Sequence, residues 1–265
     1  MKRSLLPLLV TGSSLAGLLA LTQATAQDTA APTDTSAQAA VNTQAHPIAV
    51  QTDLRRITPI QGDAAAGKAK STVCAACHGA NGMSIAPTFA NLAGQRADFL
   101  YWQLRDFHAT ALPTSPMTPM VAKLSEQDMR DLAAYYASLP ASTPAPATAA
   151  GAPTDDAVLQ QGRSLYLNGN PDRGIPPCQG CHGADATGHP DALRVDANGY
   201  TPYAVYPALR GQPFIYLRTQ LGHYRNGTLQ HSTTDRLMSP VAHRLDDDGI
   251  AAVAAWLASL PPATQ

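Results

Sequence analysis

The chain has few cysteines, few charges and no long apolar run after its first residues. Only 14% of its 265 residues are charged, and the formal net charge is −1. Without a basic excess, the sequence lacks the electrostatic footprint of a nucleic-acid-binding protein. No segment alternates apolar and polar residues as a half-buried strand does, which argues against a β fold. All four cysteines lie in two short motifs, and this economy indicates one chemistry performed twice.

The N-terminus has the three parts of an export signal. Lys2 and Arg3 supply positive charge, and residues 5–21 form an apolar stretch. Residues 24–26, Ala-Thr-Ala, provide a small-residue cleavage site, so we expect residues 1–26 to be a signal peptide. The stretch is short and diluted for a membrane span. If it were retained, it would tether the protein to a membrane.

Two segments rich in alanine, threonine and proline divide the rest of the chain. Residues 27–60 have no apolar period, and we expect a disordered lead-in there. Residues 141–153 have the same character and are expected to form a Pro/Ala linker. The remaining chain consists of two units, residues 61–140 and residues 154–265. Their combined length is enough for two modest domains.

The two units are a repeat. The run CAACHGA in the first unit matches CQGCHGA in the second, and LAAYYASLP near the end of the first matches VAAWLASLP. Between these runs, residues 89–95 (FANLAGQ) match residues 206–212 (YPALRGQ). Other matched positions include Gly67 with Gly162, Phe99-Leu100 with Tyr216-Leu217, and Met117 with Met238. Such an internal repeat predicts the same fold twice.

The spacing of apolar residues predicts helices. They recur at helical intervals in residues 97–109 and 213–226, and the Ala-rich segment 63–77 should deliver the first cysteines at its end. Ser125 and Asp128 form a plausible capping box for the last helix of the first unit. We therefore expect an all-α protein of two small helical bundles. Units of this size bury little apolar area alone, so something else must fill each one.

The cysteine motifs indicate what fills the units. They are Cys74-Ala-Ala-Cys77-His78 and Cys178-Gln-Gly-Cys181-His182. Two cysteines three residues apart on a helical turn can bond the two vinyl groups along one edge of a porphyrin, and the adjacent histidine can ligate the iron. Cys-x-x-Cys-His is the attachment signature of c-type haem. The sequence therefore predicts two covalently bound haem c groups.

Three other interpretations of the cysteines compete with haem. A four-cysteine zinc site usually has a shorter gap than the roughly 100 residues between these pairs, and does not need the histidines. A thioredoxin-like redox pair would lie near a strand-helix-strand pattern, which is missing. Disulfides suit an exported protein, but pairs three residues apart are poor staples for two large units.

The second axial ligand decides whether such an iron carries electrons or binds substrates. Met117 and Met238 occupy equivalent positions, each two residues before a proline, and we expect them to ligate the two irons. Met120 is the rival to Met117, but its counterpart is Val241, which cannot ligate. Met83 has no equivalent and is interpreted as packing. The remaining histidines have no matched partner and are expected at the surface or near propionates: His46, His108, His189, His223, His231 and His243.

The tandem motifs, with L-x-GQ, Y/F-L-x-x-QL and M-x-P in order, resemble the dihaem cytochrome c4 family over about residues 61–265 apart from the linker. The resemblance implies two tandem class I cytochrome c domains in a periplasmic electron carrier. It implies His/Met iron from His78 with Met117 and from His182 with Met238. In such domains a loop proline carbonyl commonly accepts the proton of the ligand histidine, and Pro87 is in the matching place.

This interpretation predicts an electron carrier without substrate turnover of its own. It would carry electrons from a quinol-oxidising complex towards a terminal oxidase. The alternatives are the haem subunit of a periplasmic dehydrogenase or a dihaem peroxidase, for which one iron would need an open position. The second unit departs from the family pattern. It has 13 more residues between its motif histidine and the matched glycine, mostly in 189–205. Such a loop is inert surface or a docking site for a partner.

Overall fold

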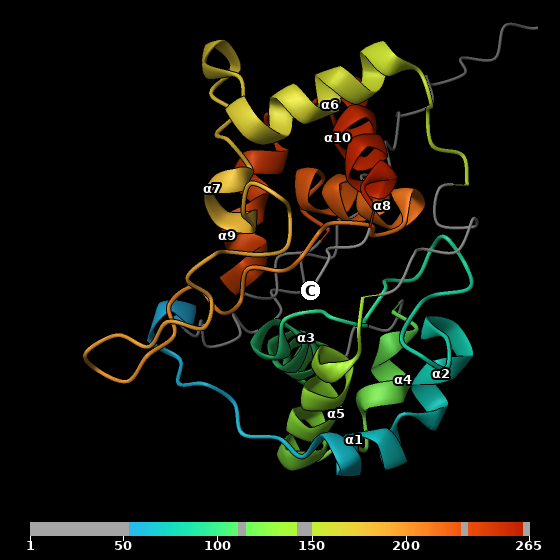
Figure 1. Ribbon diagram of the computed structural model, residues 1–265, viewed down its shortest axis with the longest axis vertical. Helices are drawn as coiled ribbons and strands as arrows, with labels where there is room; N and C mark the ends of the chain where they lie inside the picture. The colour runs from blue at the N-terminus through green and yellow to red at the C-terminus, as the bar shows by residue number, and fades with distance from the viewer. Residues whose placement is uncertain (1–52, 111–114, 142–149, 229–232, 262–265) are drawn as a thin grey trace, which may run out of the picture. The chain divides into compact units, whose positions relative to one another are not determined.

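A computed structural model describes residues 53–110, 115–141, 150–228 and 233–261. Their regular secondary structure is helical, and their only β pairing is an isolated bridge between Asn170 and Ile175 (Figure 1). The predicted all-α fold is therefore confirmed. None of the helices in these ranges is both long and apolar enough to cross a bilayer. The expected signal peptide and most of the expected lead-in and linker lie outside the described residues.

Five helices form the first lobe. They are α1 (Ala64–Lys70), α2 (Thr72–His78), α3 (Ala97–Thr110), α4 (Met117–Val121) and α5 (Glu126–Ser138). Helix α1 packs against α5, and α3 packs against both α4 and α5. The capping box of Ser125 and Asp128 is present at the start of α5, as predicted. The helix expected over residues 63–77 is divided at Ser71 into α1 and α2.

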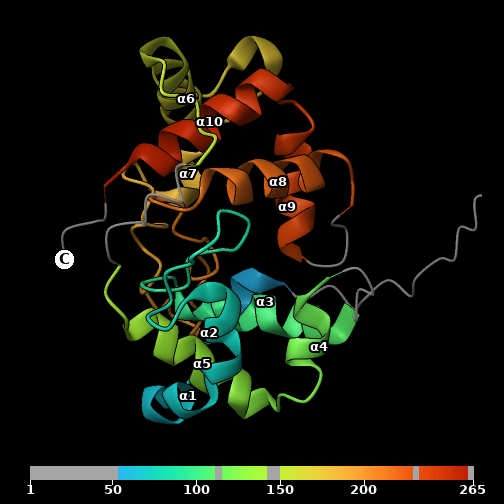
Figure 2. The same cartoon turned by 90° about the vertical axis from the view of Figure 1, so that its right-hand side faces the viewer.

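Five further helices form the second lobe. They are α6 (Asp156–Asn168), α7 (Gln179–His182), α8 (Phe214–Arg225), α9 (Thr233–Ala242) and α10 (Asp247–Ser259), with short 3-10 turns at η1 (Leu54–Arg56) and η3 (Pro171–Arg173). Helix α6 packs against α10, and α8 packs against α9 and α10 (Figure 2). This pairing repeats that of the first lobe. The repeat found in the sequence is therefore a repeat of structure.

A glycine permits the same close helix crossing in each lobe. A Cβ atom on Gly67 of α1 would lie 2.0 Å from the carbonyl oxygen of Asp131 in α5. A Cβ on Gly162 of α6 would lie 2.0 Å from the carbonyl oxygen of Ala252 in α10. No side chain fits at such a distance from backbone, so both crossings require glycine.

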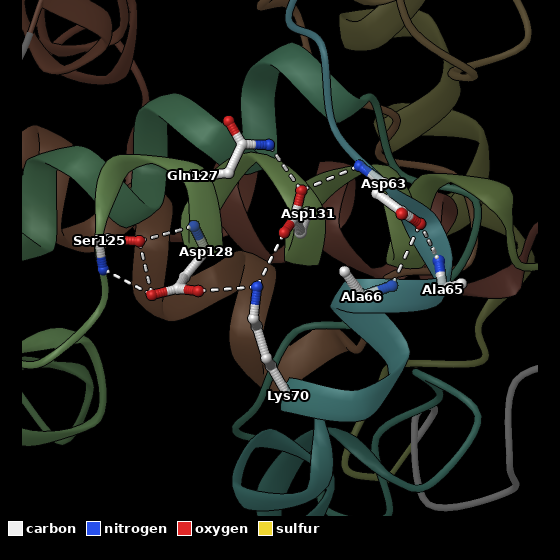
Figure 3. Close-up of polar contacts among 8 residues, drawn as sticks. All are labelled: Asp63, Ala65, Ala66, Lys70, Ser125, Gln127, Asp128 and Asp131. Carbon is white, nitrogen blue, oxygen red and sulfur yellow. Dashed lines mark hydrogen bonds and ion pairs between the residues drawn. The ribbon is translucent and has the colours of Figure 1, made fainter.

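A polar cluster fastens the crossing of α1 and α5 in the first lobe (Figure 3). Lys70 Nζ lies 2.7 Å from an Asp128 oxygen and 2.8 Å from Asp131 Oδ2. Asp131 Oδ1 also accepts hydrogen bonds from the backbone N–H of Asp63 and from the Gln127 amide. Because the Asp131 side chain is only 5% exposed, these contacts satisfy a carboxylate that burial would otherwise penalise.

Residues 53–60 differ from the expected disordered lead-in. Leu54 and Ile57 are buried, and the Ile57 carbonyl oxygen accepts the backbone N–H of Thr201 at 2.8 Å. The residues that pack against this segment are Ala204 and Val205 of the inserted loop and Trp102 of α3. The side chains of Leu54 and Ile57, one 3-10 turn apart, are enough to pack the segment against the rest of the protein. A single such pair gives no periodic signal in the sequence. The end of the insertion, around Ala204 and Val205, is therefore packed, whereas Leu193 and Val195 in its middle are exposed.

Candidate haem sites

The two cysteine pairs lie at equivalent places in the two lobes. Cys74 and Cys77 are half-buried on α2, and Cys178 and Cys181 flank the start of α7. None of the four forms a disulfide in the structure, which gives no support to a disulfide role. Burial raises the pKa of Cys74 and raises that of Cys178 to about 11, because the apolar surroundings disfavour a thiolate. In each pair the first sulfur faces its lobe's apolar core.

The two histidines of the motifs are buried and oriented alike. His78 Nδ1 lies 2.8 Å from the carbonyl oxygen of Ala90, and His182 Nδ1 lies 3.0 Å from that of Pro207. A carbonyl oxygen only accepts, so the proton resides on Nδ1 and the lone pair on Nε2. Burial lowers the pKa of both imidazoles, which favours the neutral form that binds metals.

Pro87 does not orient His78, so this part of the sequence-based interpretation is wrong. Its carbonyl oxygen accepts instead the backbone N–H of Tyr216 at 3.0 Å. The acceptor is Ala90, three residues later. The repeat contains the signal that was missed, since Ala90 and Pro207 are aligned within the runs FANLAGQ and YPALRGQ. What matters at this position is a backbone oxygen, which any residue supplies.

The loop that supplies each carbonyl is fixed by matched contacts. The Gly82 oxygen accepts the N–H groups of Leu92 and Ala93, and the Ala186 oxygen accepts those of Leu209 and Arg210 at the equivalent positions. An aromatic ring precedes each acceptor residue and meets the histidine edge-on. The ring pairs are His78 with Phe89, at 6.0 Å between centroids, and His182 with Tyr206, at 6.4 Å. Each imidazole is thus held in both position and tautomer.

The two candidate methionines also occupy equivalent elements. Met117 is the first residue of α4 and Met238 lies within α9, and both are half-buried. Helices α4 and α9 pack against α3 and α8, which correspond in the repeat. The rival Met120 is 41% exposed at the other end of α4. Position and burial therefore favour Met117 over Met120 as the candidate ligand, as the sequence repeat also does.

The donor set of each lobe fits covalent haem. Two thiols on one helical turn stand beside a neutral, buried imidazole with its lone pair on Nε2, which is the set that c-type attachment requires. The zinc interpretation is not supported, because the cysteine pairs lie in different lobes. Among the described residues, no three His, Cys, Asp or Glu side chains gather into a group that could hold a metal ion.

Comparison with known proteins agrees with this donor set. The family model for cytochrome c matches residues 64–140 and 160–261. Cytochrome c4 of Thiocapsa roseopersicina is 39% identical over 203 residues, which is 76% of this chain and 95% of that protein. A thiosulfate dehydrogenase electron acceptor of Thiomonas intermedia is 36% identical over 74% of this chain and 82% of its own length.

The fold gives the same answer. The crystal structure of reduced recombinant cytochrome c4 from Pseudomonas stutzeri has a TM-score of 0.62 and 35% sequence identity, covering 76% of this chain and all of that one. Redox carriage by two c-type haems accounts for the duplicated motif, the duplicated bundle and the two oriented imidazoles. The chain belongs to the cytochrome c family and is a dihaem electron carrier of the cytochrome c4 type, with one covalently bound haem c in each lobe.

Proposed function

We propose that this protein is a periplasmic shuttle that takes electrons from a quinol-oxidising complex and delivers them towards a terminal oxidase. The observation that carries the proposal is the duplicated histidine geometry, in which both lobes hold a neutral imidazole by a backbone carbonyl. Because the two lobes hold their motif histidines alike, they suit two irons that each carry one electron, whereas a substrate-binding iron would call for a difference at this position. The haem iron supplies one-electron chemistry within each lobe.

The proposed attachment and ligand residues follow the repeat. In the first lobe Cys74 and Cys77 would attach the haem, and His78 Nε2 and Met117 Sδ would ligate its iron. In the second lobe Cys178 and Cys181 would attach the haem, and His182 and Met238 would ligate its iron. The carbonyl acceptors support the histidine assignments, because the oxygen that orients Nδ1 also raises the basicity of the ligating nitrogen. A methionine sulfur raises the reduction potential, which suits the high-potential end of a respiratory chain.

The N-terminal signal supports export, and periplasmic residence follows from cleavage after Ala26. We propose that the haem domains span residues 61–140 and 154–265 and that residues 141–153 connect them. The packed segment 53–60 then belongs with the folded part of the mature protein. A retained signal would instead make residues 27–52 a tether to the membrane.

A second candidate donor is thiosulfate dehydrogenase. It is favoured by one observation, namely the relative from Thiomonas intermedia that is named as the electron acceptor of that enzyme. The two candidates differ in which reduced enzyme transfers electrons quickly. Stopped-flow mixing of the oxidised protein with each reduced donor separates them, since a physiological pair reacts far faster than a mismatched one at low ionic strength.

The ligand assignment is tested by replacing each methionine with alanine. Met117→Ala and Met238→Ala should each remove about half of the red-region sulfur-to-iron absorption band of the oxidised protein, because each site contributes one of two such bonds. Each variant should also gain one site that binds carbon monoxide when reduced. Met120→Ala is the matched control and should leave the band intact. A full band in Met117→Ala, or fast carbon monoxide binding by the unaltered protein, would contradict the carrier assignment.

A further inference from the structure

The two lobes exchange hydrogen bonds through a pair of matched glutamines. Gln95 of the first lobe donates from Nε2 to the Ala208 carbonyl oxygen and accepts the Ala208 N–H at Oε1, both at 2.8 Å. Gln212 of the second lobe makes the same two bonds to Asn91, at 2.8 Å to the carbonyl oxygen and 2.9 Å from the N–H. Each glutamine side-chain amide therefore binds the backbone N–H and carbonyl oxygen of one residue in the opposite lobe's loop.

That residue is the one directly after the histidine's acceptor. The peptide group between Ala90 and Asn91 presents its carbonyl oxygen to His78 Nδ1 and its N–H to Gln212 Oε1. A single amide thus joins the imidazole of the first lobe to a side chain of the second. Hydrogen bonds on the two ends of one amide polarise each other, so the bond to Gln212 strengthens the carbonyl as an acceptor.

The second lobe has the same arrangement with the roles exchanged. The peptide group between Pro207 and Ala208 presents its oxygen to His182 Nδ1 and its N–H to Gln95 Oε1. The hydrogen-bond arrangements of the two lobes differ in one respect. Gln95 Oε1 also accepts the N–H of Arg96, whereas the residue after Gln212 is a proline, which has no N–H. Gln95 Oε1 therefore accepts two backbone N–H groups, those of Ala208 and Arg96. Of the corresponding two positions, Gln212 Oε1 accepts only the N–H of Asn91.

Burial makes these bonds consequential. Gln95 and Gln212 are each 6% exposed and Asn91 is 5% exposed, so water competes little for their polar groups. The Asn91 side chain is itself fixed, because it accepts the Ser84 N–H and donates to the Gly211 carbonyl oxygen, both at 2.9 Å. The peptide that orients His78 is therefore held at both ends by buried partners.

We propose that Gln212 is a positioning residue for His78 and Gln95 one for His182, so that each lobe tunes the histidine ligand of the other. The inference rests on the proposed ligand roles of the two histidines. A stronger acceptor at Nδ1 gives the imidazole more anionic character, which favours ferric iron and lowers the reduction potential. Loss of a glutamine therefore raises the potential of the haem in the opposite lobe.

The test uses the full-length protein with both haems and the variants Gln212→Leu and Gln95→Leu. Redox titration followed by NMR resolves the two haems, whose signals are assigned through neighbouring lobe-specific residues. Gln212→Leu should shift the reduction equilibrium of the first-lobe haem by about threefold, or about 30 mV for a one-electron couple. Gln95→Leu should shift the second-lobe haem in the same direction by less, because Gln95 Oε1 is shared with Arg96.

The Nδ1 proton of each ligand histidine gives an independent readout in the ferrous, diamagnetic protein. Its resonance should move upfield for His78 in Gln212→Leu and for His182 in Gln95→Leu, because each hydrogen bond weakens. Gln212→Glu, measured at alkaline pH, gives the Asn91 N–H a stronger acceptor and gives up the bond from Gln212 Nε2 to the Asn91 carbonyl oxygen; the His78 proton should move downfield. This variant also serves if the leucine variant fails to fold.

Thr201→Val is the matched control. Thr201 is 2% exposed and its hydroxyl donates to the Ile57 carbonyl oxygen, so the change loosens a buried contact that does not lead to either histidine. It should leave both Nδ1 protons and both potentials unchanged. Shifts in the mutated lobe itself, equal shifts in both lobes, or no shift would overturn the inference. Failure of the proposed ligand set would appear separately, as an unaltered protein without the sulfur-to-iron band.

Discussion

In the first lobe the oxygen that orients the buried histidine belongs to Ala90, and in the second it belongs to Pro207. The residue types differ, yet the position in the repeat, the preceding aromatic ring and the tautomer are the same. The lobes therefore share a backbone path, and the side chains along it are free to vary. The proline that the family resemblance implies, Pro87, has another role, because its oxygen accepts the N–H of Tyr216.

The lobes differ where the first and last helices cross. Lys70 and Asp131 make a polar contact across α1 and α5, whereas the equivalent residues in the second lobe are Leu165 and Ala252, both buried. A carboxylate-ammonium cluster stabilises the helix crossing in the first lobe, and apolar packing stabilises it in the second. The glycine at the centre of the crossing is common to both. The comparison separates what the fold requires from what each lobe adds.

The largest effect is expected at those glycines. Gly67→Ala and Gly162→Ala each place a Cβ 2.0 Å from a backbone oxygen that cannot rotate away, so the helices must separate. Each substitution should lower the free energy of unfolding of its own lobe by about 3 kcal/mol. Amide hydrogen exchange should show faster opening of α1 and α5 in the first variant, and of α6 and α10 in the second.

Gly222→Ala in α8 is the control, because nothing lies within 4 Å of its added Cβ. Replacing an unconstrained helical glycine by alanine should stabilise the protein by about 0.5–1 kcal/mol. Equal destabilisation by all three substitutions would show that the helix crossing is not the cause. A much smaller loss for one of Gly67→Ala and Gly162→Ala would show that its crossing is the more adaptable.

The sequence predicted these glycines as matched positions, together with the helices, the haem motifs and the capping box. Local signals sufficed there, because periodicity, caps and Cys-x-x-Cys-His depend on residues close in the chain. The packed segment around Ile57 and the glutamine exchange were not predicted. They join residues more than 100 positions apart, and a lone buried turn or a Gly-Gln pair carries no periodic signal.

A smaller effect is expected at the polar cluster of the first lobe. Asp131→Ala gives the residue found in the second lobe and leaves the backbone N–H of Asp63 without its acceptor. It should cost about 1–3 kcal/mol. Lys70→Leu alone should also destabilise the protein, because two carboxylates lose their cation. The double variant should cost less than the sum of the two single changes, as a calorimetric double-mutant cycle would show. Strict additivity would mean that the two side chains act independently.

The same cluster predicts a difference in acid sensitivity. Hydrogen bonds from Lys70 lower the pKa of Asp128 and of Asp131. Carboxyls with a lowered folded-state pKa contribute stability above their unfolded pKa of about 3.9, and this contribution disappears as pH falls through the folded values. Between pH 7 and strongly acidic pH, denaturant titrations should therefore show a smaller loss of stability in the double variant than in the unaltered protein. Parallel curves would rule the cluster out as a source of acid sensitivity.

The smallest effect is expected at the turn whose oxygen holds each histidine loop. The turn residue is Gly82 in the first lobe, at φ 75°, and Ala186 in the second, at φ 62°, the one non-glycine residue with positive φ in the described part of the chain. Gly82→Ala should cost about 1–2 kcal/mol, since left-handed backbone penalises a Cβ and the added atom would lie 3.0 Å from the Ala93 nitrogen. Ala186→Gly should change the free energy of unfolding by less than about 1 kcal/mol. It relieves the penalty of a Cβ in left-handed backbone, but it removes a fully buried methyl group and gives the unfolded chain more conformational entropy. Denaturant titrations of both variants measure the contrast, and a marked gain in Ala186→Gly would show that the second lobe retains strain that the first has avoided.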